Sequence, residues 1–154
     1  MRHIAGVIIG LALCAPLLMQ TAPGAGQYGI AYASFAPLNA EVFVADADGS
    51  NARLLSPNPG WDANASFSMD GQWVVFTSNR QGSADIFRVH PDGRRLERLT
   101  DDPAFDDQAT LSPDGRQLAF VSTRTGHAEV WWLDLRTKAL KNLTGRSGGS
   151  FRPT

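Results

Sequence analysis

Residues Trp73–Phe76 read WVVF and residues Leu118–Val121 read LAFV, so apolar side chains occupy consecutive positions in both segments. Neighbouring side chains on a β-strand point to opposite faces of the sheet. A strand of this composition is therefore buried on both faces, whereas a sheet packed on one side alternates apolar and polar residues. The two segments predict sheets that stack face to face.

These segments are equivalent parts of an internal repeat with a period of 44 residues, as from Val74 to Leu118. Ser68–Gly71 (SMDG) aligns in the same register with Ser112–Gly115 (SPDG). Three copies of the end of the repeat are present, at Leu54–Ser56, Arg98–Thr100 and Asn142–Thr144. A period of about 40–50 residues suits one blade of a β-propeller.

Each repeat is expected to form four short antiparallel strands separated by turns rich in Gly, Pro and Asp. In the second repeat the expected strands are Ala65–Ser68, Trp73–Ser78, Asp85–Val89 and Arg95–Leu99. Asp70-Gly71 and Asp114-Gly115 are interpreted as structural hairpin positions, because Gly accepts a positive φ without strain. The predicted fold is all-β, a partial β-propeller of about three blades at 28–60, 61–104 and 105–148, with the start of another at 149–154.

The N-terminus has the layout of a secretory signal peptide. A short basic start, Met1–His3, precedes an apolar run at 4–19 and a small, polar stretch at 20–26. We expect cleavage after Gly26, a mature propeller at 27–154 that is not inserted in a membrane, and a periplasmic or extracellular location. A retained N-terminal anchor is the alternative. The single cysteine, Cys14, lies in this segment, so no intramolecular disulfide can form.

The composition also limits the partners. Of the 154 residues, Lys and Arg number 14 against 15 Asp and Glu. A chain without a basic excess is not expected to bind nucleic acid. Its apolar content of 43% is enough for a folded core.

Ser112–Arg124 (SPDGRQLAFVSTR) resembles the signature of TolB-type, WD-like propeller repeats, and Arg98–Thr100 is similar to the end of that repeat. The resemblance covers about 28–154. It implies a six-bladed propeller, usually periplasmic or extracellular in bacteria. TolB proteins carry an α/β domain before the propeller and bind partner proteins of the cell envelope, whereas here the first repeat directly follows the signal segment.

The repeat register also leads to an expectation about the ends of the propeller. Tyr28–Ser34 aligns with the second strand of a blade, and Phe151–Thr154 aligns with the beginning of a first strand. We therefore expect a partial sequence, with a half-ring that dimerises as the alternative. Open ends expose an apolar face and unpaired strand edges, which predicts self-assembly.

The search for catalytic and metal sites gives no candidate. Gly145–Gly149 matches G-x-S-x-G, but Ser147 falls in a Gly-rich loop expected between blades and has no histidine after it. His90 and His127 occupy unrelated turn positions and form no set of metal ligands. Asp46–Asn51 is interpreted as a hairpin rather than a calcium loop, because its glycine is in the fourth place. We expect no catalytic residue, metal or cofactor.

Charged residues recur in the repeat register as the pairs Asp62/Asp106 and Arg80/Arg124. A role repeated in every blade favours structure, and we hypothesise that these residues bond each other or the backbone near blade ends, because a buried charge must be paired. The alternative is a polar binding surface, for which Asp62, Asp106 and Asp107 are the candidate binding residues.

Two functions remain open. The first is a non-catalytic, exported propeller scaffold that binds a protein or glycan partner in the cell envelope. The second is the propeller part of a larger enzyme, resembling prolyl-oligopeptidase-like peptidases or oligogalacturonate lyases. Reading the coding sequence past Thr154 would separate them.

Overall fold

The computed structural model describes residues 29–36, 39–145 and 153, and these residues form three antiparallel sheets. Sheet A contains β1 (Gly29–Ala36), β2 (Asn39–Asp46) and β3 (Arg53–Leu54). Sheet B contains β4 (Asp62–Phe67), β5 (Val74–Gln81), β6 (Ser83–Val89) and β7 (Glu97–Arg98). Sheet C contains β8 (Asp106–Leu111), β9 (Gln117–Ser122), β10 (Glu129–Asp134) and β11 (Leu140–Asn142).

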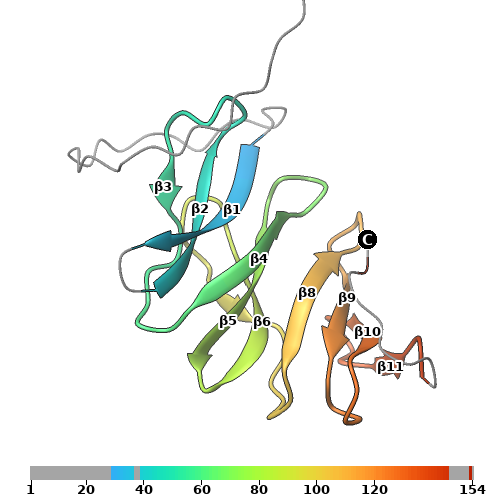
Figure 1. The fold of residues 1–154 in the computed structure, drawn as a ribbon. Helices are drawn as coiled ribbons and strands as arrows, with labels where there is room; N and C mark the ends of the chain where they lie inside the picture. The colour runs from blue at the N-terminus through green and yellow to red at the C-terminus, as the bar shows by residue number, and fades with distance from the viewer. Residues whose placement is uncertain (1–28, 37–38, 146–152, 154) are drawn as a thin grey trace, which may run out of the picture.

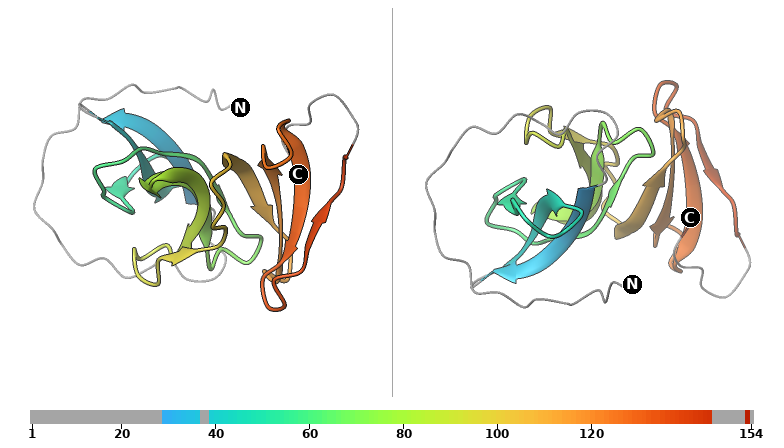
Figure 2. Two further views of the ribbon diagram at one scale, coloured as in Figure 1. Left: turned by 90° about the horizontal axis from the view of Figure 1, so that it is seen from below. Right: turned by 90° about the horizontal axis from the view of Figure 1, so that it is seen from above.

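The strands of each sheet follow one another in chain order, and the three sheets stand side by side in the order A, B, C (Figure 1). Seen from below and from above, sheet B lies between the blue sheet A and the orange sheet C (Figure 2). This is the arrangement of propeller blades, so the predicted all-β, partial-propeller fold is confirmed. The predicted signal segment, 1–26, lies outside the described residues.

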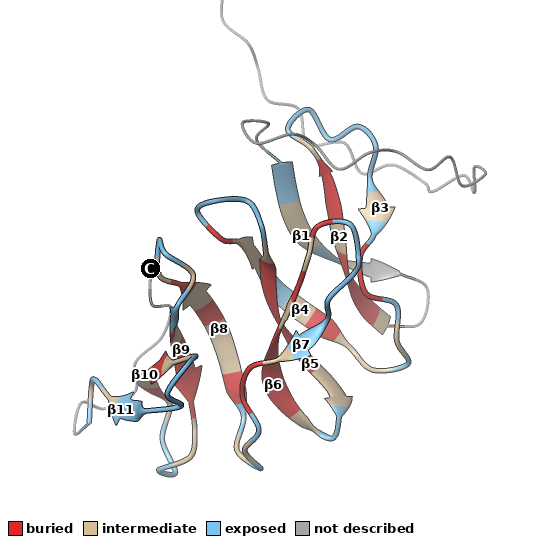
Figure 3. Cartoon of the chain, turned by 180° about the vertical axis from the view of Figure 1, so that it is seen from behind, coloured by how far each residue is buried: buried red, intermediate tan, exposed pale blue. Residues whose placement is uncertain are grey.

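Two apolar clusters between the sheets explain why the central strands are apolar throughout. Val74 and Phe76 point toward sheet A and pack with Val42 and Val44. Val75, the residue between them, points the other way and packs with residues of sheet C. Val74, Val75 and Phe76 are all buried, and the buried stripe along β5 and β6 is visible in Figure 3. The burial of both faces, which the sequence predicted, is what joins the sheets.

The strand ends differ from the sequence prediction in sheet B. β5 continues through Asn79 and Arg80, where a turn was expected. The reason is that Asn79 stays tied to Trp61: its backbone N–H donates to the Trp61 carbonyl at 3.2 Å, and its side-chain oxygen accepts from the Trp61 N–H at 2.8 Å. The outermost strand is shorter than expected, Glu97–Arg98 instead of Arg95–Leu99, because it has a sheet partner on one side only.

The first strands of sheets B and C each contain an irregularity at equivalent positions. The register with the next strand shifts between Ala63 and Ser66 in β4 and between Asp107 and Thr110 in β8. Inside these shifts Asn64 and Gln108 both have φ of 51°. A non-glycine residue in the left-handed region at a shift of register is the mark of a β-bulge. Among the described residues, no helix is long and apolar enough to cross a membrane.

Candidate functional site

The repeated charged residues lie at the junctions between sheets. At the junction of sheets A and B, the Arg80 guanidinium donates to the Asp62 carboxylate at 2.7 Å, and Asp62 is fully buried. Asp62 also accepts hydrogen bonds from Ser56 and Asn58, both at 2.9 Å. These two residues follow β3, the last strand of sheet A. The Arg80 guanidinium lies 5.3 Å from the Phe76 ring centroid and 5.1 Å from that of Phe87. These contacts tie the beginning of sheet B to the end of sheet A.

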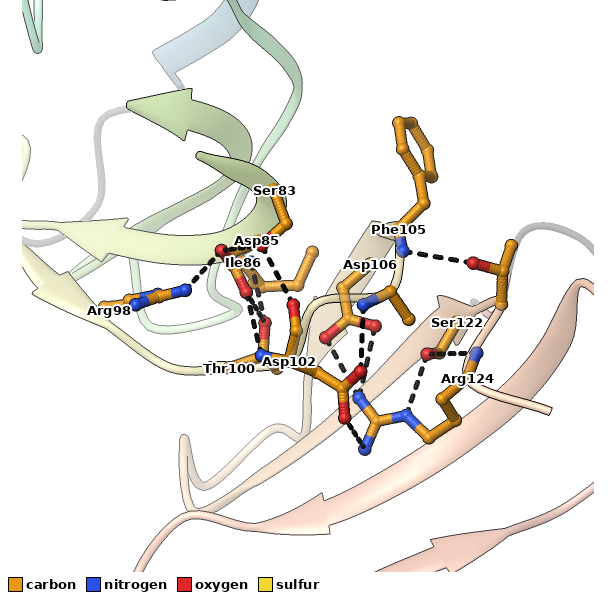
Figure 4. Close-up of polar contacts among 12 residues, drawn as sticks. Ser83, Asp85, Ile86, Arg98, Thr100, Asp102, Phe105, Asp106, Ser122 and Arg124 are labelled. Atoms are coloured by element: carbon orange, nitrogen blue, oxygen red, sulfur yellow. Dashed lines mark hydrogen bonds and ion pairs between the residues drawn. The ribbon is translucent and has the colours of Figure 1, made fainter. Parts of the chain in front are cut away.

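The same arrangement occurs 44 residues later, at the junction of sheets B and C (Figure 4). Arg124 donates to both oxygens of the buried Asp106, at 3.0 and 3.1 Å, and its Nε donates to Ser122 at 2.8 Å. Asp102, in the loop that leaves sheet B, lies 3.8 Å from Arg124. The structure therefore brings Asp62 to Arg80 and Asp106 to Arg124.

Burial controls the ionisation of Asp106. Removal of its carboxyl from water raises the pKa above the ordinary 3.8, although hydrogen bonding to Ser122 and attraction to Arg124 act in the opposite direction. The turn residue Asp114 differs, since the Ser112 hydroxyl and the Arg116 backbone N–H stabilise its charge and lower its pKa. The equivalent Asp70 has a lowered pKa through Ser68 and Gln72.

A pH-dependent effect on stability follows for Asp106. Because its pKa is raised by folding, the folded protein takes up a proton as the pH falls through the raised value toward 3.8, and this proton favours folding. The free energy of unfolding of the wild type, minus that of Asp106→Asn, should therefore rise as the pH is lowered from 7 to about 4. Urea unfolding at several pH values measures this difference.

Asp114→Asn is the matched control for this experiment. Its folded pKa is lowered, so the contribution of Asp114 is present above 3.8 and is lost as the pH falls through its folded pKa. Between pH 7 and about 4 the difference between wild type and Asp114→Asn should therefore stay nearly constant, and it should fall only at lower pH. If the curves for the two variants ran parallel between pH 7 and 4, the assigned environments would be wrong.

A further buried carboxylate, Asp85 of β6, was not among the candidates from the sequence. It accepts from Arg98 of β7 at 2.6 Å and from the Ser83 hydroxyl at 3.1 Å. The signal was present, because an acid recurs in the register at Glu41, Asp85 and Glu129. All three are buried. The partner of Asp85, Arg98, could not be found in the same way, because the equivalent positions in the other two repeats are Leu54 and Asn142.

The third candidate binding residue, Asp107, also bridges two sheets. One of its carboxylate oxygens accepts from Asn64 and from Thr77, both at 2.7 Å, and both donors belong to sheet B. Near it the aromatic rings of Trp61 and Phe105, which precede equivalent first strands, lie with their centroids 6.2 Å apart. Asp107 thus bonds sheet C directly to sheet B.

The hairpin positions of the repeat have matching geometry in sheets B and C. Asp70 accepts from the Ser68 hydroxyl at 2.6 Å, and Asp114 accepts from Ser112 at the same distance. Gly71 and Gly115 both have φ of 67°, which a side chain would strain.

A cleft of about 370 Å³ opens between sheets B and C, beside the Asp106–Arg124 junction. Its apolar lining comes from Leu99, Phe120, Leu133 and Leu140, and its charged lining from Arg98, Asp101, Asp102, Arg124 and Lys138. Arg98 and Arg124 are held in ion pairs with Asp85, Asp101, Asp102 and Asp106. Among the described residues, Lys138 is the lining cation that forms no ion pair.

Of the residues considered for catalysis and metal binding, Ser147 lies outside the described residues. His90 contacts Asp92 at 3.0 Å and the edge of the Trp73 ring, while His127 is exposed elsewhere. Within the described part of the chain, no group of three or more His, Cys, Asp or Glu residues is placed to hold a metal ion.

The stacked antiparallel sheets, joined by apolar packing between their faces, define the class of the protein as a β-propeller. The chain belongs to the TolB beta propeller domain family, whose model matches residues 17–154. The resemblance of Ser112–Arg124 to this family is thereby confirmed. The match begins within the predicted signal segment.

Individual relatives agree with the family. The Tol-Pal system protein TolB of Desulfosudis oleivorans is 31% identical over 71 residues, which are 45% of this chain and 16% of that protein. The crystal structure of TolB from Acinetobacter baumannii superposes with a TM-score of 0.68 at 27% identity, over 77% of this chain and 30% of that one. This chain therefore spans less than a third of either relative.

A more distant likeness shows the fold alone. The oligogalacturonate lyase solved in complex with manganese has a TM-score of 0.53 at 17% identity, over 67% of this chain and 28% of the lyase. A shared propeller does not carry a shared reaction, because function depends on the residues of a site.

Proposed function

We propose that this chain is a non-catalytic propeller scaffold, exported to the bacterial cell envelope, that binds a protein partner. The main support is the use of its candidate carboxylates: Asp62 accepts from Ser56 after the last strand of sheet A, Asp107 accepts from Thr77 of sheet B, and Asp106 is paired with Arg124 beside the junction of sheets B and C. Charges held in this way build a rigid support rather than a reaction centre. Membership of the TolB beta propeller domain family and the signal-like segment at 1–26 support the location.

The cleft between sheets B and C is the proposed contact for the partner. Its lining combines apolar side chains with charges of both signs, which suits a side chain of a protein better than a neutral sugar. Lys138 is available to an acidic group of the partner because the two arginines of the cleft are already paired within the chain. A glycan partner is therefore the less favoured outcome.

The larger-enzyme alternative has less support. The likeness to the oligogalacturonate lyase shows the fold alone. We therefore do not propose a reaction for this chain.

The experiment reverses the charge of Lys138. Tagged wild type, Lys138→Glu and Arg136→Glu are incubated with an envelope extract of the source bacterium, and retained proteins are quantified by mass spectrometry. Arg136 is exposed on the same hairpin but does not line the cleft. We expect one envelope protein to be retained by wild type and Arg136→Glu and several-fold less by Lys138→Glu, since charge reversal at a contact opposes association.

Two results would contradict the proposal. The first is equal retention by wild type and Lys138→Glu, which would remove the cleft from the contact. The second is retention that a glycosidase abolishes, which would make the partner a glycan.

A further inference from the structure

In the described part of the chain, the first and last sheets of the stack, A and C, each have an apolar outer face. The outer face of sheet A consists of Ile30, Tyr32 and Phe43. Tyr32 and Phe43 are register partners whose rings stack at 5.6 Å, and Ile30 is 41% exposed. Within the described residues no further sheet lies against this face. On this face Ile30 is thus exposed, and Tyr32 and Phe43 are partly exposed.

Equivalent residues in the other sheets show what this face is built to contact. In the repeat register Ile30, Tyr32 and Phe43 correspond to Val74, Phe76 and Phe87 in sheet B and to Leu118, Phe120 and Trp131 in sheet C. The sheet B set is buried against sheet A, and the sheet C set packs against sheet B. The pair Tyr32–Phe43 also has its counterpart in Phe76–Phe87, which stacks at 6.0 Å. In both described junctions this set packs onto the preceding sheet.

The outer face of sheet C carries the complementary set. It consists of Ala119, Val130 and Trp132, all partly exposed, with Trp132 the register partner of Ala119. Their counterparts are Ala31, Val42 and Val44 in sheet A and Val75, Ile86 and Arg88 in sheet B. Ala31, Val42 and Val44 pack in the cluster that joins sheets A and B, while Val75 and Ile86 pack in the cluster that joins sheets B and C. One chain therefore carries both halves of a contact that it already makes twice internally.

We propose that a second copy of this chain docks head to tail, with the outer face of its sheet A on the outer face of sheet C of the first. Tyr32 and Phe43 of one copy then meet Val130 and Trp132 of the other. Such a contact joins two different surfaces and gives a ring if the rotation closes, or a chain of copies if it does not. The proposal is independent of the proposed partner at the cleft.

The composition of the new junction predicts that it is reversible. Each of the two internal junctions has a buried ion pair beside it, Asp62–Arg80 within sheet B and Asp106–Arg124 within sheet C. In the repeat register the counterpart of these arginines in sheet A is Ala36. The contact between copies therefore rests on apolar packing without a buried ion pair, and we expect it to depend on protein concentration.

The experiment measures the mass of the purified exported chain by sedimentation equilibrium, from about 1 to 200 µM. Wild type should rise above the monomer mass with concentration. Tyr32→Asp and Trp132→Asp, which each damage one face, should weaken association at least tenfold. Met69→Asp, at an exposed residue in the hairpin between β4 and β5 and outside both faces, should associate as the wild type does.

An equimolar mixture of Tyr32→Asp and Trp132→Asp gives the sharpest result. The intact sheet A face of one variant can dock on the intact sheet C face of the other, so the mixture should associate where each variant alone does not. Circular dichroism confirms folding, and Tyr32→Ser with Trp132→Ser replaces any variant that fails to fold. A monomeric wild type at every concentration, unaffected variants, or no recovery in the mixture would overturn the proposal.

Discussion

Replacement of Phe76 by alanine should lower the stability of the folded chain by about 3–5 kcal/mol, because it leaves a cavity in a closely packed core. Phe76 is fully buried in the cluster between sheets A and B, it stacks on Phe87 at 6.0 Å, and its ring lies 5.3 Å from the Arg80 guanidinium. The substitution thus removes the packing between two sheets together with the support of a buried ion pair. The expected fall in Tm is roughly 10–20 °C.

Met69→Ala provides the control for this prediction. Met69 is 81% exposed in the hairpin before β5, so its truncation removes apolar atoms that are already in water. Its effect should stay within about 0.5 kcal/mol. Thermal unfolding followed by circular dichroism compares the two variants with the wild type. Equal Tm values for Phe76→Ala and Met69→Ala would mean that the two sheets are not held together by this cluster.

Replacement of Arg124 by methionine should cost about 3–5 kcal/mol, since it leaves the buried Asp106 without its partner. Arg124 donates to both oxygens of Asp106 and lies 5.0 Å from the Trp131 ring centroid. Methionine keeps much of the apolar length of the side chain, so the loss is mainly electrostatic. Urea unfolding of the variant measures the change.

Two further variants separate the ion pair from other effects. Arg116→Met, at an exposed turn position, should unfold as the wild type does. The double variant Arg124→Met/Asp106→Asn should regain part of the lost stability, because no uncompensated charge remains buried. An Arg124→Met protein that melts normally but no longer binds the envelope partner would assign the pair to recognition instead.

The fold could be predicted because the repeat places equivalent residues in equivalent environments. The apolar run Trp73–Phe76 predicted burial of both strand faces, and the two clusters around Val74 and Val75 confirm it. The ends of strands could not be found in this way. The extension of β5 through Arg80 depends on the side-chain bond between Asn79 and the Trp61 backbone, a contact between residues that local propensity treats separately.

The polar junctions were only partly predictable, for a related reason. Asp62 and Arg80 recur at Asp106 and Arg124, and repetition revealed them. Asp85 accepts a hydrogen bond from Arg98, whose counterparts in the other repeats are not basic. The repeat could therefore indicate the acid of this pair but not the arginine. The cleft beside it combines residues from two sheets, and its shape follows from their packing rather than from any motif.

The edge strands of sheets B and C, β4, β7, β8 and β11, affect the tendency of this chain to form fibrils at high concentration. A regular, unpaired strand edge is a template on which a foreign chain can form further hydrogen bonds and start a fibril. Here the last strands of the two sheets, β7 (Glu97–Arg98) and β11 (Leu140–Asn142), are very short. The first strands, β4 and β8, are interrupted by the bulges at Asn64 and Gln108. Neither kind of edge offers a long ladder of free backbone groups. Cross-β growth from these sheets is therefore disfavoured even when much of the protein is present.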